Sequence, residues 1–352
     1  MRKIGLKTTE LKEGMVVAKD VHNRELEIIL QEGVKLTDQL IDRLNFLYEG
    51  IEVIVYQETE EDVYDVELIN IKRFEDAEKI LHQYTEEIEN VFEDLEKNGH
   101  KTISQLKDIS VQMMEKSSDF KSIFDNIMTS INKDKYLYRH SANVSLLASM
   151  LGKWMGYDEE EIKNLATAGM LIDIGKTQVD QAILNKNGKL TEWEFQEVKK
   201  HSSLGYEMLS EIEGINDDIK IGILMHHEKE DGSGYPYGLT GDRIHRYAKI
   251  LAIVDIFDAM TSDRVYSLME SPFKVLEMFQ KDSFGKLDPN CIFIFLKNIC
   301  TYYEGEEVLL NTDEIAKIIR MNQKEISRPL IQVEDRFVDM TREKSLEIVK
   351  MA

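Results

Sequence analysis

One stretch of the sequence, residues 140–255, limits the fold more than any other part of the chain. Six of its residues, four histidines and two aspartates, are candidate site residues, and most of these six lie within or at the end of apolar-periodic segments. The six are His140, Asp173, His201, His226, His227 and Asp255, separated by 33, 28, 25, 1 and 28 residues. Each long step is about one helical hairpin. An up-and-down set of helices could therefore direct all six side chains into one pocket, which would bind metal.

The region around these residues is predicted to be all-helical. Apolar residues recur at helical spacing through residues 102–135, and no proline occurs before Pro236. Because proline breaks helices, its absence leaves the predicted helices uninterrupted until the set of candidate residues is nearly complete. The fold class expected for the chain is mainly α.

The first 57 residues differ from this pattern and predict a small β-rich domain. Short β-prone runs at 11–21 and 26–36 are separated by turn residues, and a further strand is expected at 51–56. Between them, Thr37 is a candidate N-cap for a short amphipathic helix. Nothing in this segment suggests catalysis, so we interpret it as an accessory or docking domain.

Residues 58–101 are expected to form an acidic linker followed by one amphipathic helix that ends at Asn98-Gly99. Its apolar residues alternate in steps of three and four, which is the a/d pattern of a helix with one apolar seam. The seam consists of Phe74, Ala77, Leu81, Tyr84, Ile88, Val91 and Leu95. Two interpretations stay open: a homodimer or signal-transmitting helix through residues 71–97, or a helix packed along its own domain.

Length and charge restrict the partners. A chain of 352 residues suits two or three domains. Its net charge of -22 opposes polymeric nucleic acid and anionic membranes, whereas a small phosphate-bearing ligand needs only a local cluster of cations or a metal. No apolar run is long enough for a membrane span and no signal peptide is recognisable, so we expect a cytoplasmic protein. Cys291 and Cys300 are expected to be reduced core thiols.

The adjacent pair His226-His227 is the most suggestive feature of the candidate site. If both residues lie on a helix, their rings point about 100° apart and can reach the same or neighbouring ions. Glu228 and Asp231 follow closely and could orient the two rings. Imidazoles and carboxylates without thiolates are typical of a catalytic or sensory site for iron, manganese, nickel, cobalt or zinc. They are less typical of a closed structural zinc site.

Six co-ordered motifs within about 130 residues resemble the HD-GYP family, a branch of the HD phosphohydrolases that hydrolyse cyclic di-GMP. They are R-H-S-A-N-V (139–144), D-I-G-K (173–176), I-L-N-K-N-G-K-L-T-E-W-E-F (183–195), K-H-S-S-L-G-Y-E-M-L (200–209), H-H-E-K-E-D-G-S-G-Y-P-Y-G-L (226–239) and V-D-I-F-D-A-M-T-S-D-R-V-Y (254–266). The resemblance implies an all-helical HD-type domain over 102–300. Residues 301–352 resemble the β-prone tail that often follows such domains.

The resemblance also implies roles for individual residues. The six histidines and aspartates match ligands of one or two divalent ions, with iron or manganese preferred and Asp173 in the bridging position. Asp173 and Lys176 match the catalytic residues, and Lys176 and Arg264 match cations that bind substrate phosphate. Gly234, Tyr235 and Pro236, together with Gly232, match the loop that names the family and would form one wall of the substrate pocket.

This sequence departs from the family pattern at the His-Asp doublet, because Ile172 precedes Asp173. Isoleucine has no lone pair, so the ion expected at His140, Asp173 and Asp255 loses one imidazole ligand. Two classes of function stay open. The chain is either a cyclic di-GMP phosphodiesterase with a weakened first metal site, or a receptor that binds the dinucleotide or a metal without turnover.

Overall fold

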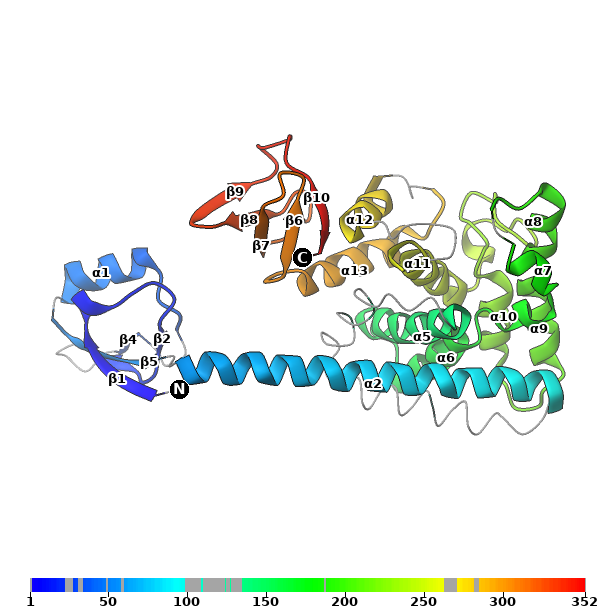
Figure 1. Cartoon of the computed structure of the whole chain (residues 1–352), viewed down its shortest axis with the longest axis horizontal. Coiled ribbons are helices and arrows are strands. Elements are labelled where there is room, and N and C mark those ends of the chain that lie inside the picture. Colours follow the sequence, from blue (N-terminus) through cyan, green and yellow to red (C-terminus); the bar gives the residue numbers. More distant parts are fainter. Residues whose placement is uncertain are drawn as a thin grey trace. The chain divides into compact units, whose positions relative to one another are not determined.

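The computed structural model describes residues 2–22, 28–30, 34–48, 50–57, 60–98, 109, 124, 127, 135–186, 188–262, 271–281 and 285–351. It consists of two compact units, Met1–Glu75 and Asp76–Ala352. The chain is mainly α, with strands near both ends (Figure 1). Most of the predicted helical segment 102–135 lies outside the described residues, but Ile109 and Ile127 are helical and buried.

The first unit is built on a three-stranded antiparallel sheet with the strand order β1-β5-β2. Thr37 caps the one helix described in this part of the chain, since its Oγ1 accepts a hydrogen bond from Leu40 N at 3.3 Å. The predicted helix and short strands of this segment are confirmed, whereas β1 was not predicted. The elements are β1 (Arg2–Lys7), β2 (Val16–Val17), β3 (Val21–His22), β4 (Ile28–Leu30), α1 (Asp38–Tyr48) and β5 (Glu52–Gln57).

Helix α2 runs without interruption from Glu60 to Asn98. Residues 60–70, which were expected to lie in an acidic linker, are helical, because this stretch has no proline or glycine and is rich in glutamate. Six of the seven seam residues are buried in the apolar core of the second unit, namely Ala77, Leu81, Tyr84, Ile88, Val91 and Leu95. The side chain of Phe74 lies outside the described part of the chain. This burial favours a helix packed along its own domain. A homodimer through residues 71–97 stays a prediction.

Five helices of the second unit carry or support the candidate residues (Figure 1). Helix α5 packs against α6 and α11, and α10 packs against α6, α9 and α11. The backbones of α5 and α6 come close together, since a Cβ atom on Gly169 would lie 2.7 Å from the Cα of Ser145. The five are α5 (Tyr136–Trp154), α6 (Glu159–Met170), α9 (His201–Ser210), α10 (Asp217–Met225) and α11 (Arg246–Thr261).

Shorter helices connect and extend this group. The 3-10 helix η2 lies directly on the backbone of α9, because a Cβ atom on Gly175 would overlap the carbonyl oxygen of His201. Only glycine therefore fits at this crossing. The remaining helices described in this unit are η2 (Ile174–Gln178), α7 (Gln181–Leu184), α8 (Glu192–Lys199), η3 (Gly241–Arg243), α12 (Pro272–Lys281), α13 (Pro289–Ile299) and η4 (Cys300–Tyr302).

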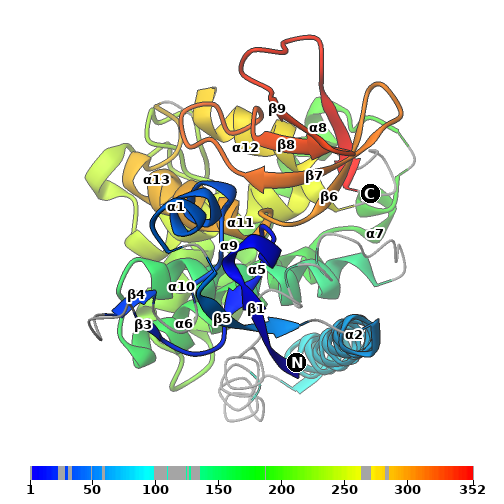
Figure 2. The same cartoon turned by 90° about the vertical axis from the view of Figure 1, so that its left-hand side faces the viewer.

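The C-terminal segment forms a five-stranded antiparallel sheet with the order β10-β6-β7-β8-β9, and its neighbouring strands β6, β7 and β8 can be followed in Figure 2. Buried residues of this sheet, among them Val308, Ile318 and Ile331, belong to the same apolar core as the helices. The β-prone tail is thus confirmed, and it shares a core with the helical region. The strands are β6 (Glu307–Leu310), β7 (Ile315–Arg320), β8 (Leu330–Val333), β9 (Arg336–Asp339) and β10 (Ile348–Met351).

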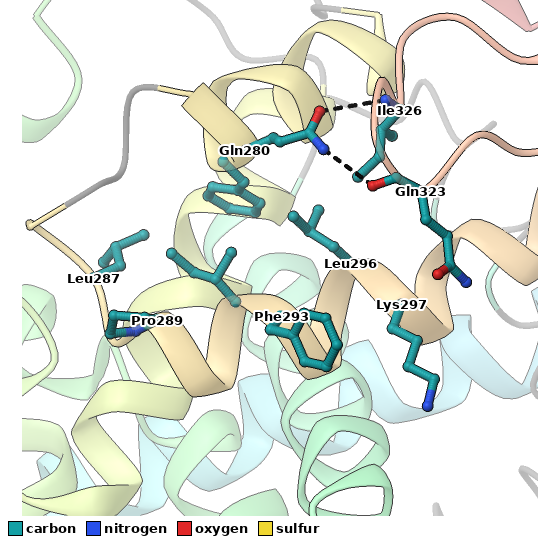
Figure 3. Close-up of a pocket in the computed structure, with 10 residues that line it drawn as sticks. Gln280, Leu287, Pro289, Phe293, Leu296, Lys297, Gln323 and Ile326 are labelled. Carbon is teal, nitrogen blue, oxygen red and sulfur yellow. Dashed lines mark hydrogen bonds between the residues drawn. The ribbon is translucent and has the colours of Figure 1, made fainter.

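An apolar cavity of about 230 Å³ lies between α12, α13 and the loop that holds Gln323 and Ile326 (Figure 3). Gln280 joins this loop to α12: its Nε2 donates to Gln323 O at 3.2 Å, and its Oε1 accepts from Ile326 N at 3.3 Å. None of the candidate site residues lines this cavity.

Both cysteines are free and buried, as expected. None of the described helices combines the length and the apolar character needed to cross a bilayer.

Candidate metal centre

The structure brings the six predicted donors together from five separate places in the chain. His140 lies on α5 and Asp255 on α11, Asp173 immediately precedes η2, and His201 is the first residue of α9. His226 and His227 follow the last residue of α10, so the pair lies in a turn, whereas the sequence analysis considered it on a helix. Tight clustering of polar side chains inside an apolar bundle is costly unless they bind something.

Asp173 lies between two groups of donors. Its Oδ2 is 3.6 Å from His140 Nε2, and its Oδ1 is 3.6 Å from His201 Nε2. His140 Nε2 also lies 3.1 Å from Asp255 Oδ1. One carboxylate thus faces both groups, with one oxygen directed at each.

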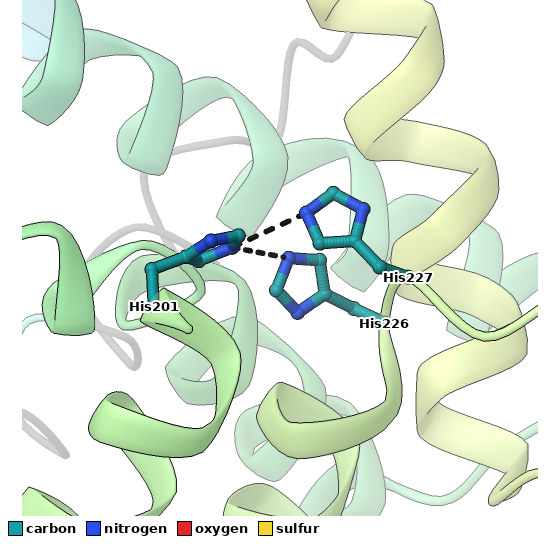
Figure 4. A group of neighbouring side chains, drawn as sticks. All are labelled: His201, His226 and His227. Atoms are coloured by element: carbon teal, nitrogen blue, oxygen red, sulfur yellow. Dashed lines mark hydrogen bonds between the residues drawn. The ribbon is translucent and has the colours of Figure 1, made fainter. Parts of the chain in front are cut away.

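Three imidazoles form the second group (Figure 4). His201 Nε2 lies 3.3 Å from His226 Nε2 and 3.2 Å from His227 Nε2. At metal–nitrogen distances of about 2.0–2.1 Å, two nitrogens on one ion are separated by roughly 2.9–3.4 Å. The observed nitrogen separations match those of ligands that share a metal ion.

Backbone carbonyl groups fix the tautomers of two of these rings. His201 Nδ1 lies 2.7 Å from Val198 O, and His226 Nδ1 lies 2.6 Å from Ile223 O. Because a carbonyl oxygen only accepts, each Nδ1 carries the hydrogen and each Nε2 of the neutral ring has a free lone pair. Two lone pairs that face each other at 3.3 Å repel unless a cation or a proton lies between them.

Burial keeps these rings neutral. It lowers the pKa of His201 to about 4, with His226 adding to the effect and Asp173 opposing it. Burial also lowers the pKa of His226 and takes that of His227 well below its ordinary value. The three rings are therefore ready to bind a metal near neutral pH without first losing a proton.

His140 has the opposite electrostatic character. Burial disfavours its charged form, but hydrogen bonds to Asp255 and Asp258 raise its pKa to about 9. His140 Nδ1 lies 2.6 Å from Asp258 Oδ2. Asp258 is fully buried, and its Oδ1 accepts from Asn143 Nδ2 at 2.7 Å and from Ser262 Oγ at 3.1 Å. The ring of His140 is thus held with Nε2 toward the two aspartates of the site.

The sequence analysis missed Asp258, although a signal was present. Asp258 lies three residues after Asp255 on α11, and Asn143 lies three residues after His140 on α5. This spacing places each pair on one helix face. Polar residues one turn from a predicted ligand, on a helix that is otherwise apolar, were the available clue.

Lys176 provides a cation beside the bridging carboxylate. Its Nζ lies 2.6 Å from Asp173 Oδ2, one turn along η2. Burial would raise the pKa of Asp173, but Lys176, His140 and His201 hold it below the usual range for aspartate. The pKa of Asp255 is also lowered, because His140 outweighs the effect of burial. Both aspartates are therefore ionised at neutral pH.

The loop at 226–239 folds over the histidines. Glu228 does not orient the rings as expected: its carboxylate accepts from Tyr237 N at 2.7 Å and from Leu239 N at 2.8 Å, which fixes the loop. Asp231 instead accepts from Ser233. A Cβ atom on Gly234 would lie 2.5 Å from His227 O, so only glycine allows this approach.

Tyr235 covers one side of the centre. Its ring centroid lies 4.6 Å from that of His227, and the Tyr235-Pro236 peptide bond is cis. Of the other predicted substrate-binding residues, Arg264 lies outside the described residues.

Ile172 is fully buried and belongs to the apolar core. On the other side of the centre, the ring of Tyr136 stacks on His140 at a centroid distance of 5.7 Å. Lys249 pairs with Glu230 at 3.0 Å and Asp288 at 3.1 Å. Among the residues described, the donors are thus four imidazoles and two carboxylates, with neither cysteine among them. This set fits a divalent metal.

Comparison with known proteins supports this description. Residues 126–291 match the family model of the HD domain. The chain is 32% identical over 200 residues to the cyclic di-GMP phosphodiesterase PA4108 of Pseudomonas aeruginosa, covering 57% of this chain and 48% of that protein. It is 34% identical over 173 residues to the 3'3'-cGAMP-specific phosphodiesterase 1 of Vibrio cholerae, covering 49% and 40%. The chain therefore spans less than half the length of these two relatives.

A solved structure has the same fold. It is Bd1817, an HDG"Y"P protein from Bdellovibrio bacteriovorus, with a TM-score of 0.51 and 16% sequence identity. The match covers 85% of this chain and 99% of that one.

Proposed function

Since residues 126–291 match the family model of the HD domain, we propose that the chain is a metal-dependent phosphodiesterase that hydrolyses cyclic di-GMP or a closely related cyclic dinucleotide. The observation that carries the proposal is Asp173, whose two oxygens face separate groups of buried donors while Lys176 lies beside it. A site with two groups of donors about one carboxylate suits phosphodiester hydrolysis.

Several residues have defined tasks in this proposal. His201, His226 and His227 hold one divalent ion, and His140 with Asp255 faces a second position; Asp173 serves both. The ion supplies Lewis acidity at phosphorus and activates water when bound. Iron or manganese suits the mixture of imidazole and carboxylate donors.

The residues around the ions bind and orient the substrate. Lys176, as a compact point charge, holds a non-bridging phosphate oxygen. Arg264 is proposed as a second phosphate-binding cation. Gly234, Tyr235 and Pro236 form a wall of the pocket, and the Tyr235 ring, stacked on His227, limits access of water to that side. A cytoplasmic location stays a prediction.

One observation favours a second function, a receptor that binds cyclic dinucleotide without turnover. Ile172 replaces an imidazole donor next to Asp173 and is fully buried. The site around His140 therefore has fewer neutral donors than the three-histidine group, and its occupancy would depend on the metal concentration.

The two functions are separated by turnover. Purified protein is incubated with cyclic di-GMP and either Mn²⁺ or anaerobic Fe²⁺, and products are resolved by chromatography while bound metal is counted. The phosphodiesterase gives pGpG or GMP, and Asp173→Asn abolishes the product. Asp217→Asn, which removes a similar charge at an exposed position, is the control and leaves turnover unchanged. Tight dinucleotide binding without product at full metal occupancy supports the receptor instead.

A further inference from the structure

Three side chains form a ledge beside the metal centre: Phe195, Lys199 and Tyr235. Lys199 Nζ lies 4.8 Å from the centroid of the Phe195 ring and 5.2 Å from that of Tyr235. Phe195 and Lys199 are four residues apart on α8 and so share one face of the helix. Phe195 is 44% exposed, so its ring is accessible to a ligand.

The ledge is continuous with the metal centre. Tyr235 packs on His227 at 4.6 Å between ring centroids and meets the edge of His201 at 6.4 Å. Lys199 is separated from His201 by one residue. A ligand whose phosphate reaches the three-histidine group can therefore extend along Tyr235 and Lys199 to the exposed ring of Phe195.

Lys199 has no carboxylate partner among the residues that the structure describes, unlike two nearby lysines. Lys186 pairs with Glu194 and Lys200 pairs with Glu197, but no carboxylate of the described residues lies within ion-pair distance of Lys199. In a chain with a net charge of -22, an unpaired cation over an aromatic ring beside the metal centre favours an anionic, flat ligand.

We propose that this ledge is a base-binding subsite, in which Phe195 stacks on one guanine of a cyclic dinucleotide and Lys199 lies near the adjoining sugar-phosphate. The proposal rests on the function proposed above. Stacking of a base on an aromatic side chain supports binding of any base, so the ledge would provide affinity while the metal centre selects the phosphodiester.

The test compares a base-containing substrate with one that has no base. KM and kcat are measured for cyclic di-GMP and for methyl 4-nitrophenyl phosphate, with the same metal. Phe195→Ala is expected to raise KM for cyclic di-GMP about 10-fold, as loss of one stacked base implies. Its kcat, and both parameters for the base-free substrate, stay within about twofold. Phe195→Tyr retains an aromatic ring and restores the parent KM.

The matched control is Trp193→Ala. Trp193 is another exposed aromatic residue of α8 (65% exposed), but it is two residues from Phe195 and therefore on a different face of the helix. Its removal leaves KM for cyclic di-GMP unchanged. If Phe195 only stabilises α8, its removal alters both substrates equally, and that result overturns the proposal.

Direct binding separates failure of the ledge from failure of the proposed function. Isothermal titration with cyclic di-GMP is carried out on the metal-loaded parent and on Phe195→Ala. A parent that binds but does not hydrolyse, with about 10-fold weaker binding in the variant, supports the ledge and contradicts the phosphodiesterase. A parent that hydrolyses, with no change in KM on substitution, contradicts the ledge alone. A parent that neither binds nor hydrolyses contradicts both.

Discussion

Replacement of Asp258 tests whether a buried carboxylate, and not a metal ligand itself, controls the His140 side of the centre. Asp258→Asn keeps the shape of the side chain and removes its charge. The His140 ring is held by a 2.6 Å contact to Asp258 and has no other partner recorded at Nδ1. With an amide at position 258, the contact that holds the ring is weaker, and the ring is free to turn its Nε2 away from the metal position.

The expected magnitude follows from the contacts. A hydrogen bond to a charged group contributes about 1.5–3 kcal/mol, compared with about 0.5–1.5 kcal/mol for a neutral pair. Loss of charge at the His140 contact should therefore cost about 1–2 kcal/mol in binding, which is roughly a 5- to 30-fold loss of metal affinity at this side. Changes of residues that orient metal ligands commonly cost about 10- to 100-fold.

The assay is competition for Mn²⁺ against a chromophoric chelator, with metal counting at saturation. Asp258→Asn is expected to lose affinity at one position only, because His201 and His226 are fixed by backbone carbonyl groups and do not depend on Asp258. In the metal-free protein the pKa of His140 falls. Ser262→Ala is the matched control: it removes a 3.1 Å donor to Asp258 and leaves the contact to His140 in place. If Asp258→Asn binds the metal at both positions with the same affinity as the parent protein, the reasoning is refuted.

Three further predictions concern separate parts of the second unit. Ile172→His adds an imidazole next to Asp173, so metal occupancy and turnover of cyclic di-GMP should both rise; a variant no better metallated than the parent would exclude Ile172 as the lesion. In Glu228→Gln the side-chain NH2 group faces one of the two backbone N–H donors that the carboxylate satisfied, so the free energy of unfolding should fall by about 1–3 kcal/mol. Asp231→Asn, at an exposed position, should leave the free energy of unfolding unchanged. His245 Nδ1 accepts a hydrogen bond from Tyr247 N and so caps α11. Burial lowers the pKa of His245, so the cap is intact above about pH 6.5, the ordinary pKa of histidine, and is lost as the pH falls toward the lowered pKa. The difference in unfolding free energy between parent and His245→Asn, which caps at any pH, should therefore change by up to about 1 kcal/mol between pH 8 and pH 5, and a constant difference would contradict this assignment.

The six donor residues could be predicted from the sequence, because their residue types and their order along the chain are enough to indicate a metal site. Six residues in this order, most of them within or at the end of apolar segments, were predicted to meet, and their side chains do lie together. The supporting contacts could not be predicted in the same way. Asp258 was missed and Glu228 was assigned the wrong task, because the partner of a buried carboxylate depends on the angle between helices and on the path of a loop.

The same distinction applies to the fold. Period and turn residues predicted the helices and the N-terminal strands, since these are local properties, whereas the β-prone tail was predicted from the family resemblance. Pairing is not local: β1 joins β5 from the far end of its unit, and the tail contributes to the same apolar core as the helices. The acidic stretch at 60–70 was misread because a high density of charge is typical of both linkers and exposed helices.

The crossing at Gly175 makes the centre vulnerable at a residue that donates nothing to it. The 3-10 turn that begins at Asp173 and the helix that begins at His201 touch through their main chains at this one position. Any side chain there acts as a wedge that separates a carboxylate from an imidazole, though neither has been altered. A variant that loses its metal can therefore arise from added bulk at a position that no inventory of ligands would include.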